Sequence, residues 1–194
     1  VTLLGIAGFF LIEEPKMDTS ANGKYFANIL YGFRPGVVRS NPMLYRTLIG
    51  YAIFGIAINI FMPYLILYYE KSLAMDNYVF IFAPAIILAA AFTAFYGKTY
   101  DRKGFLPALI PTLALLMGGF AVLYFFKATA LVFLGTLIML MGYLSGMAVF
   151  GAAIRTYTPQ NKAGMFQGLR ILGQVLLPGI IGPAIGAAVL KNAE

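Results

Sequence analysis

The stretch Gly97–Phe105, which reads GKTYDRKGF, places four charged side chains within nine positions of an otherwise apolar region. No charged residue occurs from Asn77 to Gly97 before them, or from Gly104 to Phe126 after them. Each of these flanks reaches the roughly 20 residues that an α-helix needs to cross the hydrocarbon core of a bilayer. The stretch is therefore expected to be a short polar turn between two membrane-spanning helices.

The whole chain has the composition of an integral membrane protein. Its 194 residues are 61% hydrophobic and 11% charged, whereas a soluble domain is about 45–50% apolar and about 25% charged. The charge-free windows long enough to span a bilayer are Thr47–Tyr69, Asn77–Gly97, Gly104–Phe126, Ala128–Ile154 and Ile171–Leu190. A further apolar run, Val1–Ile12, is expected to be the end of a truncated helix. The predicted fold is an all-α, polytopic transmembrane bundle with five complete spans.

Basic residues alternate between rich and poor connectors along the chain. The connectors at 13–46, 98–103 and 155–170 hold eleven of the fourteen lysines and arginines. Because basic residues close to membrane spans stay in the cytoplasm, these connectors are predicted to be cytoplasmic. We expect a multi-pass protein of the cell membrane, surrounded by lipid. Nucleic acid is not an expected partner, since no basic face is shared with stacking aromatic residues.

Smaller signals predict helix starts, helix contacts and interfacial residues. Asn41 before Pro42 and Thr158 before Pro159 suit the N-cap and first position of a helix. Three Gly-x-x-x-Gly pairs indicate close helix contacts, namely Gly142 with Gly146, Gly164 with Gly168 and Gly182 with Gly186. Tyr68, Tyr69 and Tyr124 lie at the ends of windows and are expected to form an interfacial aromatic belt.

The polar turn also carries a motif. The pattern G-x-x-x-D-R-x-G, formed by Gly97, Asp101, Arg102 and Gly104, resembles the signature of the major facilitator superfamily between two membrane helices. The superfamily pattern usually ends in a further basic residue, where this chain has Phe105. The resemblance implies a helical secondary transporter.

A second stretch extends the resemblance to most of the chain. The segment Arg155–Pro159, followed by Gly164 and Gly168, is similar to the loop before the eleventh helix of the superfamily. The resemblance then implies the carboxyl-terminal half of a twelve-helix transporter without its last helix. On this assignment residues 1–12 end helix six, 13–41 form a cytoplasmic inter-half loop, and 42–194 form the helix bundle. The missing amino-terminal half is the expected partner.

The motif suggests residues that gate transport. The candidates are Gly97, Asp101, Arg102, Gly104, Arg155 and Arg170. Gly97 and Gly104 permit a tight turn, and Asp101 can accept hydrogen bonds at the N-terminus of the helix expected to begin at Thr158–Pro159. Such a contact exists only when the cytoplasmic helix ends lie together, so it would latch one transport state. The alternatives are a turn without a switching role and, for Arg170, a side chain that snorkels to the interface.

Polar residues inside the spans are candidates for solute binding, because they normally face protein or water. These candidates are Tyr51, Asn59, Tyr143 and Gln174. Tyr51 and Asn59 share one helical stripe, and Asn59 lies near the middle of its window. Its amide suits a solute hydroxyl or carbonyl, and equally a bond to a neighbouring helix. Tyr143 can instead pack in the bundle.

The missing residue types bear on the class of function. The chain has no histidine and no cysteine, and no acidic residue lies within a charge-free window. A nucleophile with its base, or a metal with its ligands, cannot be assembled from the spans, so neither an enzyme nor a cofactor is expected. Coupling to protons or sodium stays open, and for proton coupling the titrating residue is expected in the missing amino-terminal half. Facilitated diffusion is the alternative without coupling.

The sequence therefore predicts a secondary transporter, a permease that moves a small solute by alternating access. Its neutral polar groups favour an uncharged polar solute such as a sugar or a metabolite. A multidrug efflux antiporter is the alternative favoured by its spans, which are rich in phenylalanine and methionine and lack tryptophan. A membrane scaffold or sensor that does not transport is the alternative from another class.

Overall fold

The computed structural model describes residues 31–75, 77–159 and 163–191. Within these ranges the chain is helical and contains no β-strand. The apolar run at 1–12 and most of the predicted loop at 13–41 lie outside the described residues. Five helical segments are long and apolar enough to cross a membrane, which confirms the predicted all-α polytopic bundle.

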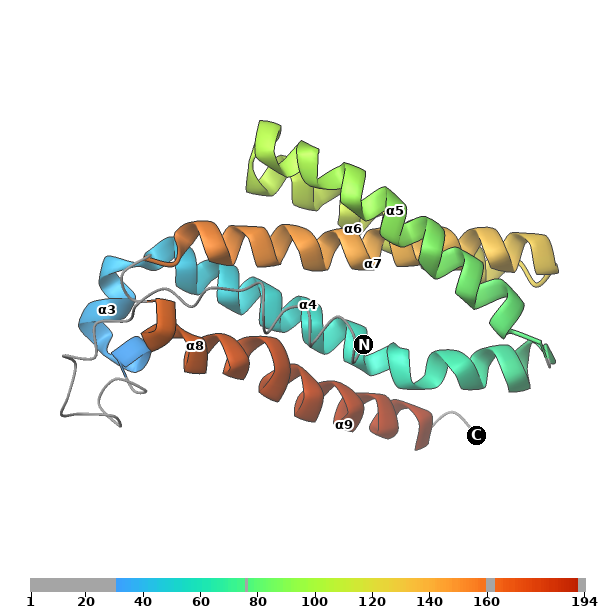
Figure 1. Cartoon of the computed structure of the whole chain (residues 1–194). Coiled ribbons are helices and arrows are strands. Elements are labelled where there is room, and N and C mark those ends of the chain that lie inside the picture. The colour runs from blue at the N-terminus through green and yellow to red at the C-terminus, as the bar shows by residue number, and fades with distance from the viewer. Residues whose placement is uncertain (1–30, 76, 160–162, 192–194) are drawn as a thin grey trace, which may run out of the picture.

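The five spans correspond to the five charge-free windows. They are α4 (Pro42–Leu67) with the π-turn η2 (Tyr68–Ser72), α5 (Val79–Lys103), α6 (Phe105–Phe125), α7 (Thr129–Tyr157), and a last span made of α8 (Ala163–Ile171), the π-turn η4 (Leu172–Leu176) and α9 (Leu177–Lys191). Figure 1 shows α4, α7 and the last span as long, nearly aligned rods, with α5 inclined across α7. We call the end of the bundle where α4 and α6 begin the basic end, since it carries the basic connectors.

The described part of the predicted loop folds against the basic end. It contains the 3₁₀-turn η1 (Tyr31–Phe33) and the short helix α3 (Pro35–Ser40). The Tyr45 hydroxyl donates a hydrogen bond to the carbonyl of Gly32. The Tyr31 ring meets the edge of Phe166 on α8, with ring centroids 5.9 Å apart. These contacts attach η1 to both α4 and α8.

One of the two predicted helix starts is in place, and the other adjoins residues 160–162, which lie outside the described ranges. Helix α4 begins at Pro42 after Asn41, although the Asn41 amide donates to the carbonyl of Val37 at 3.0 Å and does not cap α4. Thr158 ends α7, because its hydroxyl donates to the carbonyl of Ile154 at 2.6 Å. The next helix is described from Ala163 onward.

The expected turn from Gly97 to Gly104 is shorter than predicted. Helix α5 continues through Lys103, and Gly104 alone separates it from α6. Gly104 has a φ of 82°, which glycine adopts without steric cost. Gly97 lies inside α5, and a Cβ there would meet nothing within 4 Å, so it makes neither a turn nor a close contact. Basic residues in the last turn of α5 suit the negative end of the helix dipole.

Helix α7 is the centre of the bundle. It packs most extensively against α6 and next against α5, whereas α4 packs chiefly against α9. Glycines permit the close approaches: a Cβ on Gly142 would lie 2.4 Å from the backbone nitrogen of Leu116, and one on Gly186 would lie 2.6 Å from the carbonyl oxygen of Ile60. The predicted contacts at Gly142–Gly146 and Gly182–Gly186 are thus confirmed. A Cβ on Gly164 would meet nothing within 4 Å.

The predicted aromatic belt is wrong at Tyr69. Tyr69 is fully buried, and its hydroxyl shares a hydrogen bond of 2.6 Å with that of Thr136 on α7. The neighbouring Tyr68 donates to the carbonyl of Leu123 on α6 at 2.6 Å. The two tyrosines of η2 therefore tie the end of α4 to the helices beside it. Tyr124, at 78% exposure, lies on the surface as expected of a belt residue.

Candidate functional site

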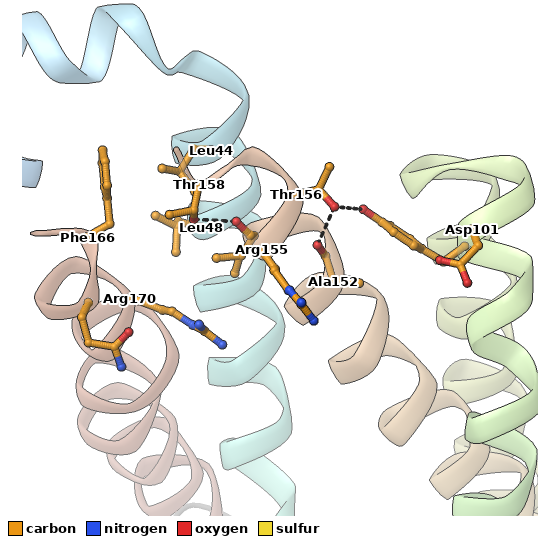
Figure 2. Close-up of a pocket in the computed structure, with 12 residues that line it drawn as sticks. Leu44, Leu48, Asp101, Ala152, Arg155, Thr156, Thr158, Phe166 and Arg170 are labelled. Carbon is orange, nitrogen blue, oxygen red and sulfur yellow. Dashed lines mark hydrogen bonds between the residues drawn. The ribbon is translucent and has the colours of Figure 1, made fainter. Parts of the chain in front are cut away.

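A cavity of about 800 Å³ lies at the basic end of the bundle (Figure 2). Residues of α4, α5, α7 and α8 form its walls. The lining residues are Leu44, Leu48, Tyr100, Asp101, Ala152, Ile154, Arg155, Thr156, Thr158, Phe166, Gln167 and Arg170. The first, fourth and last spans thus border the cavity, and the end of α5 adds a further wall.

A hydrogen-bond chain joins two of these walls. The Tyr100 hydroxyl on α5 lies 3.2 Å from the Thr156 hydroxyl on α7, and Thr156 donates to the carbonyl of Ala152 at 2.9 Å (Figure 2). Sequence reasoning missed both Tyr100 and Thr156. Their positions in the sequence could have indicated them, because Tyr100 directly precedes Asp101 of the motif and Thr156 directly follows Arg155.

Two arginines reach the cavity from adjacent helices. Figure 2 shows the side chains of Arg155 and Arg170 directed into the space between α7 and α8, with Asp101 across the cavity on α5. Arg155 is exposed and Arg170 is half-buried. The Nε of Arg170 donates to Oε1 of Gln174 at 3.4 Å. Arg170 therefore faces the bundle, which argues against the alternative of a side chain that snorkels to the interface.

Two of the four predicted solute-binding residues, Tyr51 and Gln174, interact with Arg170, and a third, Tyr143, lies near Tyr51. Besides the bond to Gln174, Arg170 lies within electrostatic range of Tyr51, which is likewise in range of Tyr143. The Tyr51 hydroxyl donates to Sδ of Met147 at 3.2 Å. We refer to Tyr51, Tyr143, Arg170 and Gln174 as the Arg170 cluster. The cluster adjoins the cavity through Arg170, which is the one member of the cluster that also lines the cavity.

The fourth predicted binding residue, Asn59, lies apart from the cluster. Its Nδ2 donates to the carbonyl of Gly55 at 2.8 Å, one turn back in the same helix. Its Cβ faces Gly182 on α9, where an added Cβ would come within 2.4 Å. The amide thus bonds neither a neighbouring helix nor a group of the cavity, and its predicted contact with a solute stays a prediction.

A π-turn shapes the last span beside the cluster. The N–H of Leu177 bonds the carbonyl of Leu172, five residues back, within η4. Pro178 follows, and because proline has no N–H it leaves the carbonyl of Gln174 without its helical partner. The Pro178 ring packs on Gly55 of α4, where a Cβ would lie 2.8 Å from its Cγ. Such π-turns are frequent at functional sites, and Pro178 was the sequence signal for this one.

The gating candidates are divided between several environments. Asp101 lines the cavity, and together with Gly97 it also borders a smaller cavity of about 240 Å³ between α5 and α7. Among the described residues the Asp101 carboxylate has no hydrogen-bond or ion-pair partner. Residues 160–162 lie outside them, so the contact of Asp101 with a helix N-terminus stays a prediction. Arg102 is exposed and borders neither cavity.

Metal-binding chemistry has no support in the part of the chain that the structure describes. No group of three or more histidine, cysteine, aspartate or glutamate side chains comes together there. Every buried side-chain nitrogen or oxygen within the described ranges has a hydrogen-bond partner. No fully buried side-chain nitrogen or oxygen in these ranges is therefore left over for a ligand.

The comparison with known protein families agrees with this architecture. The family model described as Major Facilitator Superfamily matches residues 1–191. The chain belongs to the major facilitator superfamily. Membership confirms the resemblance found in the sequence, and it places the chain in a family of transporters rather than of enzymes.

A curated relative supports the same membership. The chain is 33% identical, over 166 residues, to a protein named Multidrug resistance protein MdtG from Yersinia enterocolitica. The match covers 81% of this chain and 39% of the relative, so the chain spans well under half of the relative's length. No solved structure matches the chain.

Proposed function

We propose that this chain is part of a secondary transporter that moves small amphipathic solutes across the membrane by alternating access. The observation that carries the proposal is the cavity of about 800 Å³ formed by four spans at the basic end. Small-molecule sites commonly occupy about 300–1,000 Å³ and combine apolar walls with a few polar groups. In this cavity Leu44, Leu48 and Phe166 are the apolar walls, beside the charged Asp101, Arg155 and Arg170.

Alternating access assigns roles to the two ends of the bundle. The basic end faces the cytoplasm if the positive-inside rule holds, so the cavity would receive solute from that side. In many carriers one bundle rocks against another around a central site. The relative MdtG is more than twice as long as its matched part, and we propose that a second helical bundle supplies the opposite wall. Closure would then bring partners to Asp101 and Arg102.

Two observations support an amphipathic solute. The first is the printed name of the relative, which associates that protein with multidrug resistance. The second is that several polar groups inside the spans are already bonded: Asn59 to Gly55, Tyr69 to Thr136, and Tyr51 to Met147. These groups offer little to a strongly hydrated solute, whereas an apolar body fits the walls of the cavity.

An uncharged polar solute, such as a sugar or a metabolite, is the second candidate. The observation that favours it is Tyr143, a half-buried member of the Arg170 cluster whose hydroxyl has no hydrogen-bond partner among the described residues. A hydroxyl in this position can donate to a solute or accept from one. Either solute could be coupled to protons or sodium through a titrating group outside the charge-free windows.

Flux through proteoliposomes tests the proposal. The protein that carries this chain is reconstituted, and uptake of a fluorescent amphipathic dye and of a radiolabelled hexose is measured with and without a proton or sodium gradient. Saturable dye flux that exceeds hexose flux is the expected result. Hexose flux without dye flux would select the second candidate. No flux of either kind, in protein shown to be folded, would favour the scaffold or sensor.

A further inference from the structure

Two arginines line the same cavity, and few acidic groups near them neutralise their charge. Arg155 lies in the last turn of α7 and Arg170 in the last turn of α8, and both line the cavity at the basic end. Among the described residues that line the cavity, Asp101 is the one acidic residue, and it lies across from them on α5 (Figure 2). Within the described ranges neither arginine forms an ion pair. Like charges that share a cavity repel one another, so an anion between them would be stabilised.

The geometry of Arg170 leaves most of its donors available. A guanidinium group has five N–H donors in a planar fork. In Arg170 the Nε donor is directed to Gln174 of the π-turn, which leaves the four N–H groups on the two terminal nitrogens. Those terminal nitrogens are the ones that bind phosphate or carboxylate oxygens in pairs. Gln174 is thus a positioning residue that orients the fork of Arg170.

We propose that Arg155 and Arg170 form a binding site for an oxyanion, a phosphate or carboxylate group carried by a molecule that enters the cavity. The inference rests on the proposed function and deepens it, because it assigns the head group of the amphipathic solute. Asp101 repels an anion from the α5 wall, so the oxyanion is placed on the side of α7 and α8. Leu48 and Phe166 line the same cavity and contact the apolar body.

The oxyanion can come from two sources, a soluble molecule or the head group of a membrane lipid. Anionic lipids accumulate at basic pockets between membrane helices on the cytoplasmic side. Both sources present the same phosphate chemistry to the arginine pair. The experiment therefore separates them by the composition of the membrane.

Equilibrium binding to the purified protein tests the site without any transport step. The whole protein that carries this chain is placed in nanodiscs of neutral phosphatidylcholine, and inorganic phosphate is titrated while thermal unfolding and binding heat are recorded. Arg155→Gln and Arg170→Gln are each expected to weaken phosphate binding by about tenfold or more, the loss that follows from a charge-assisted hydrogen bond. Arg170→Lys is expected to weaken phosphate binding less than Arg170→Gln, because lysine keeps the positive charge although it lacks the planar fork.

The control is Arg39→Gln, which removes an exposed cation of α3 that does not line the cavity. It should bind phosphate as the unaltered protein does. Gln174→Leu should weaken binding less than Arg170→Gln, and its effect should vanish in the Arg170→Gln background, because it acts through Arg170. A simple structural role for Gln174 would lower the unfolding temperature without this dependence.

The lipid arm repeats the titration in nanodiscs that contain phosphatidylglycerol. If phosphatidylglycerol competes with phosphate, the site takes a lipid head group, and if it does not, the site takes a soluble oxyanion; both results support the arginine pair. The inference is overturned if phosphate neither binds nor stabilises the protein, or if Arg39→Gln weakens binding as much as the two cavity variants. Because binding needs no flux, a failure of transport with intact phosphate binding overturns only the proposed function.

Discussion

Asp101 is the residue at which gating can be tested by a change of a single atom. Its carboxylate lines the cavity and has no partner among the described residues, so it is free to bind a group that arrives when the cavity closes. Asp101→Asn keeps the shape and removes the charge. We expect solute flux to fall by about tenfold or more, as for the loss of a charge-assisted hydrogen bond. Initial rates at equal amounts of inserted protein measure the effect.

The matched change for Asp101 is Lys98→Gln, which removes a charge one turn earlier in α5 from an exposed side chain outside the cavity. Its flux should equal that of the unaltered protein. If Asp101→Asn also transported as fast as the unaltered protein, the motif would determine topology without any gating role. Poor membrane insertion of Asp101→Asn, measured separately, would also contradict the gating role.

The buried pair of Tyr69 and Thr136 offers a test of stability at the same scale. Thr136 also donates to the carbonyl of Val132 at 2.7 Å, so Tyr69→Phe leaves it with a partner. Thr136→Val instead leaves the buried Tyr69 hydroxyl without a hydrogen-bond partner. It should therefore lower the free energy of unfolding more than Tyr69→Phe does. Coupling of about 0.6 kcal/mol is typical of such pairs in membranes. A double-mutant cycle in detergent unfolding measures it, and strict additivity would contradict the pairing.

Single residues also show where sequence reasoning succeeded and where it failed. Tyr51, Tyr143 and Gln174 were selected because polar groups are costly in a bilayer. In the structure Tyr51 and Gln174 interact with Arg170, and Tyr143 interacts with Tyr51. Solute binding by these three residues stays a prediction. Tyr69 was assigned to the interface because it ends a window. A tyrosine at that depth can face lipid or a neighbouring helix, and only the packing of η2 on α7 decides between them.

At the level of elements, the close contact between α6 and α7 is made by only one of two neighbouring glycines of α6. A Cβ on Gly119 would lie 2.4 Å from the backbone nitrogen of Met139, whereas one on Gly118 would meet nothing within 4 Å. Gly119→Ala should therefore destabilise the bundle by about 1–3 kcal/mol, the usual cost of overpacking. Gly118→Ala should be neutral or slightly stabilising, because alanine is the better helix former.

Thermal unfolding of the two glycine variants in the same detergent compares neighbouring positions of one helix. A drop in unfolding temperature for Gly119→Ala alone is expected. Equal drops for both variants would mean that helix flexibility, rather than the close contact with α7, makes glycine necessary here.

Element boundaries followed from the sequence only where a residue forces them. Pro42 and Gly104 fix a helix start and a helix break, and both were predicted. Gly97 was predicted to turn the chain, yet an isolated glycine is tolerated inside a helix, and no breaker occurs before Gly104. Thr158 suited the start of a helix as well as the end of one, and its bond to Ile154 makes it the end of α7.

At the scale of the whole molecule, the number of spans was predictable and the position of the cavity was not. Spans follow from the length of apolar windows, a property of the chain alone. The cavity depends on how α4, α5, α7 and α8 are arranged at the basic end, and helix arrangement is set by contacts between distant residues. From the sequence alone, Asp101, Arg155 and Arg170 were accordingly predicted to gate transport, and the solute was predicted to bind among polar groups deeper in the spans.

The central claim is that one end of the bundle holds both the motif and the cavity, and that this end faces the cytoplasm. The chain has no cysteine, so single cysteines can be introduced at Arg102 and Thr156 on the basic end and at Tyr124 on the other. A membrane-impermeant maleimide is applied to sealed right-side-out and inside-out vesicles. We predict that Arg102→Cys and Thr156→Cys react only from the cytoplasmic side and Tyr124→Cys only from the opposite side. Labelling of Arg102→Cys and Thr156→Cys from opposite sides would contradict the account.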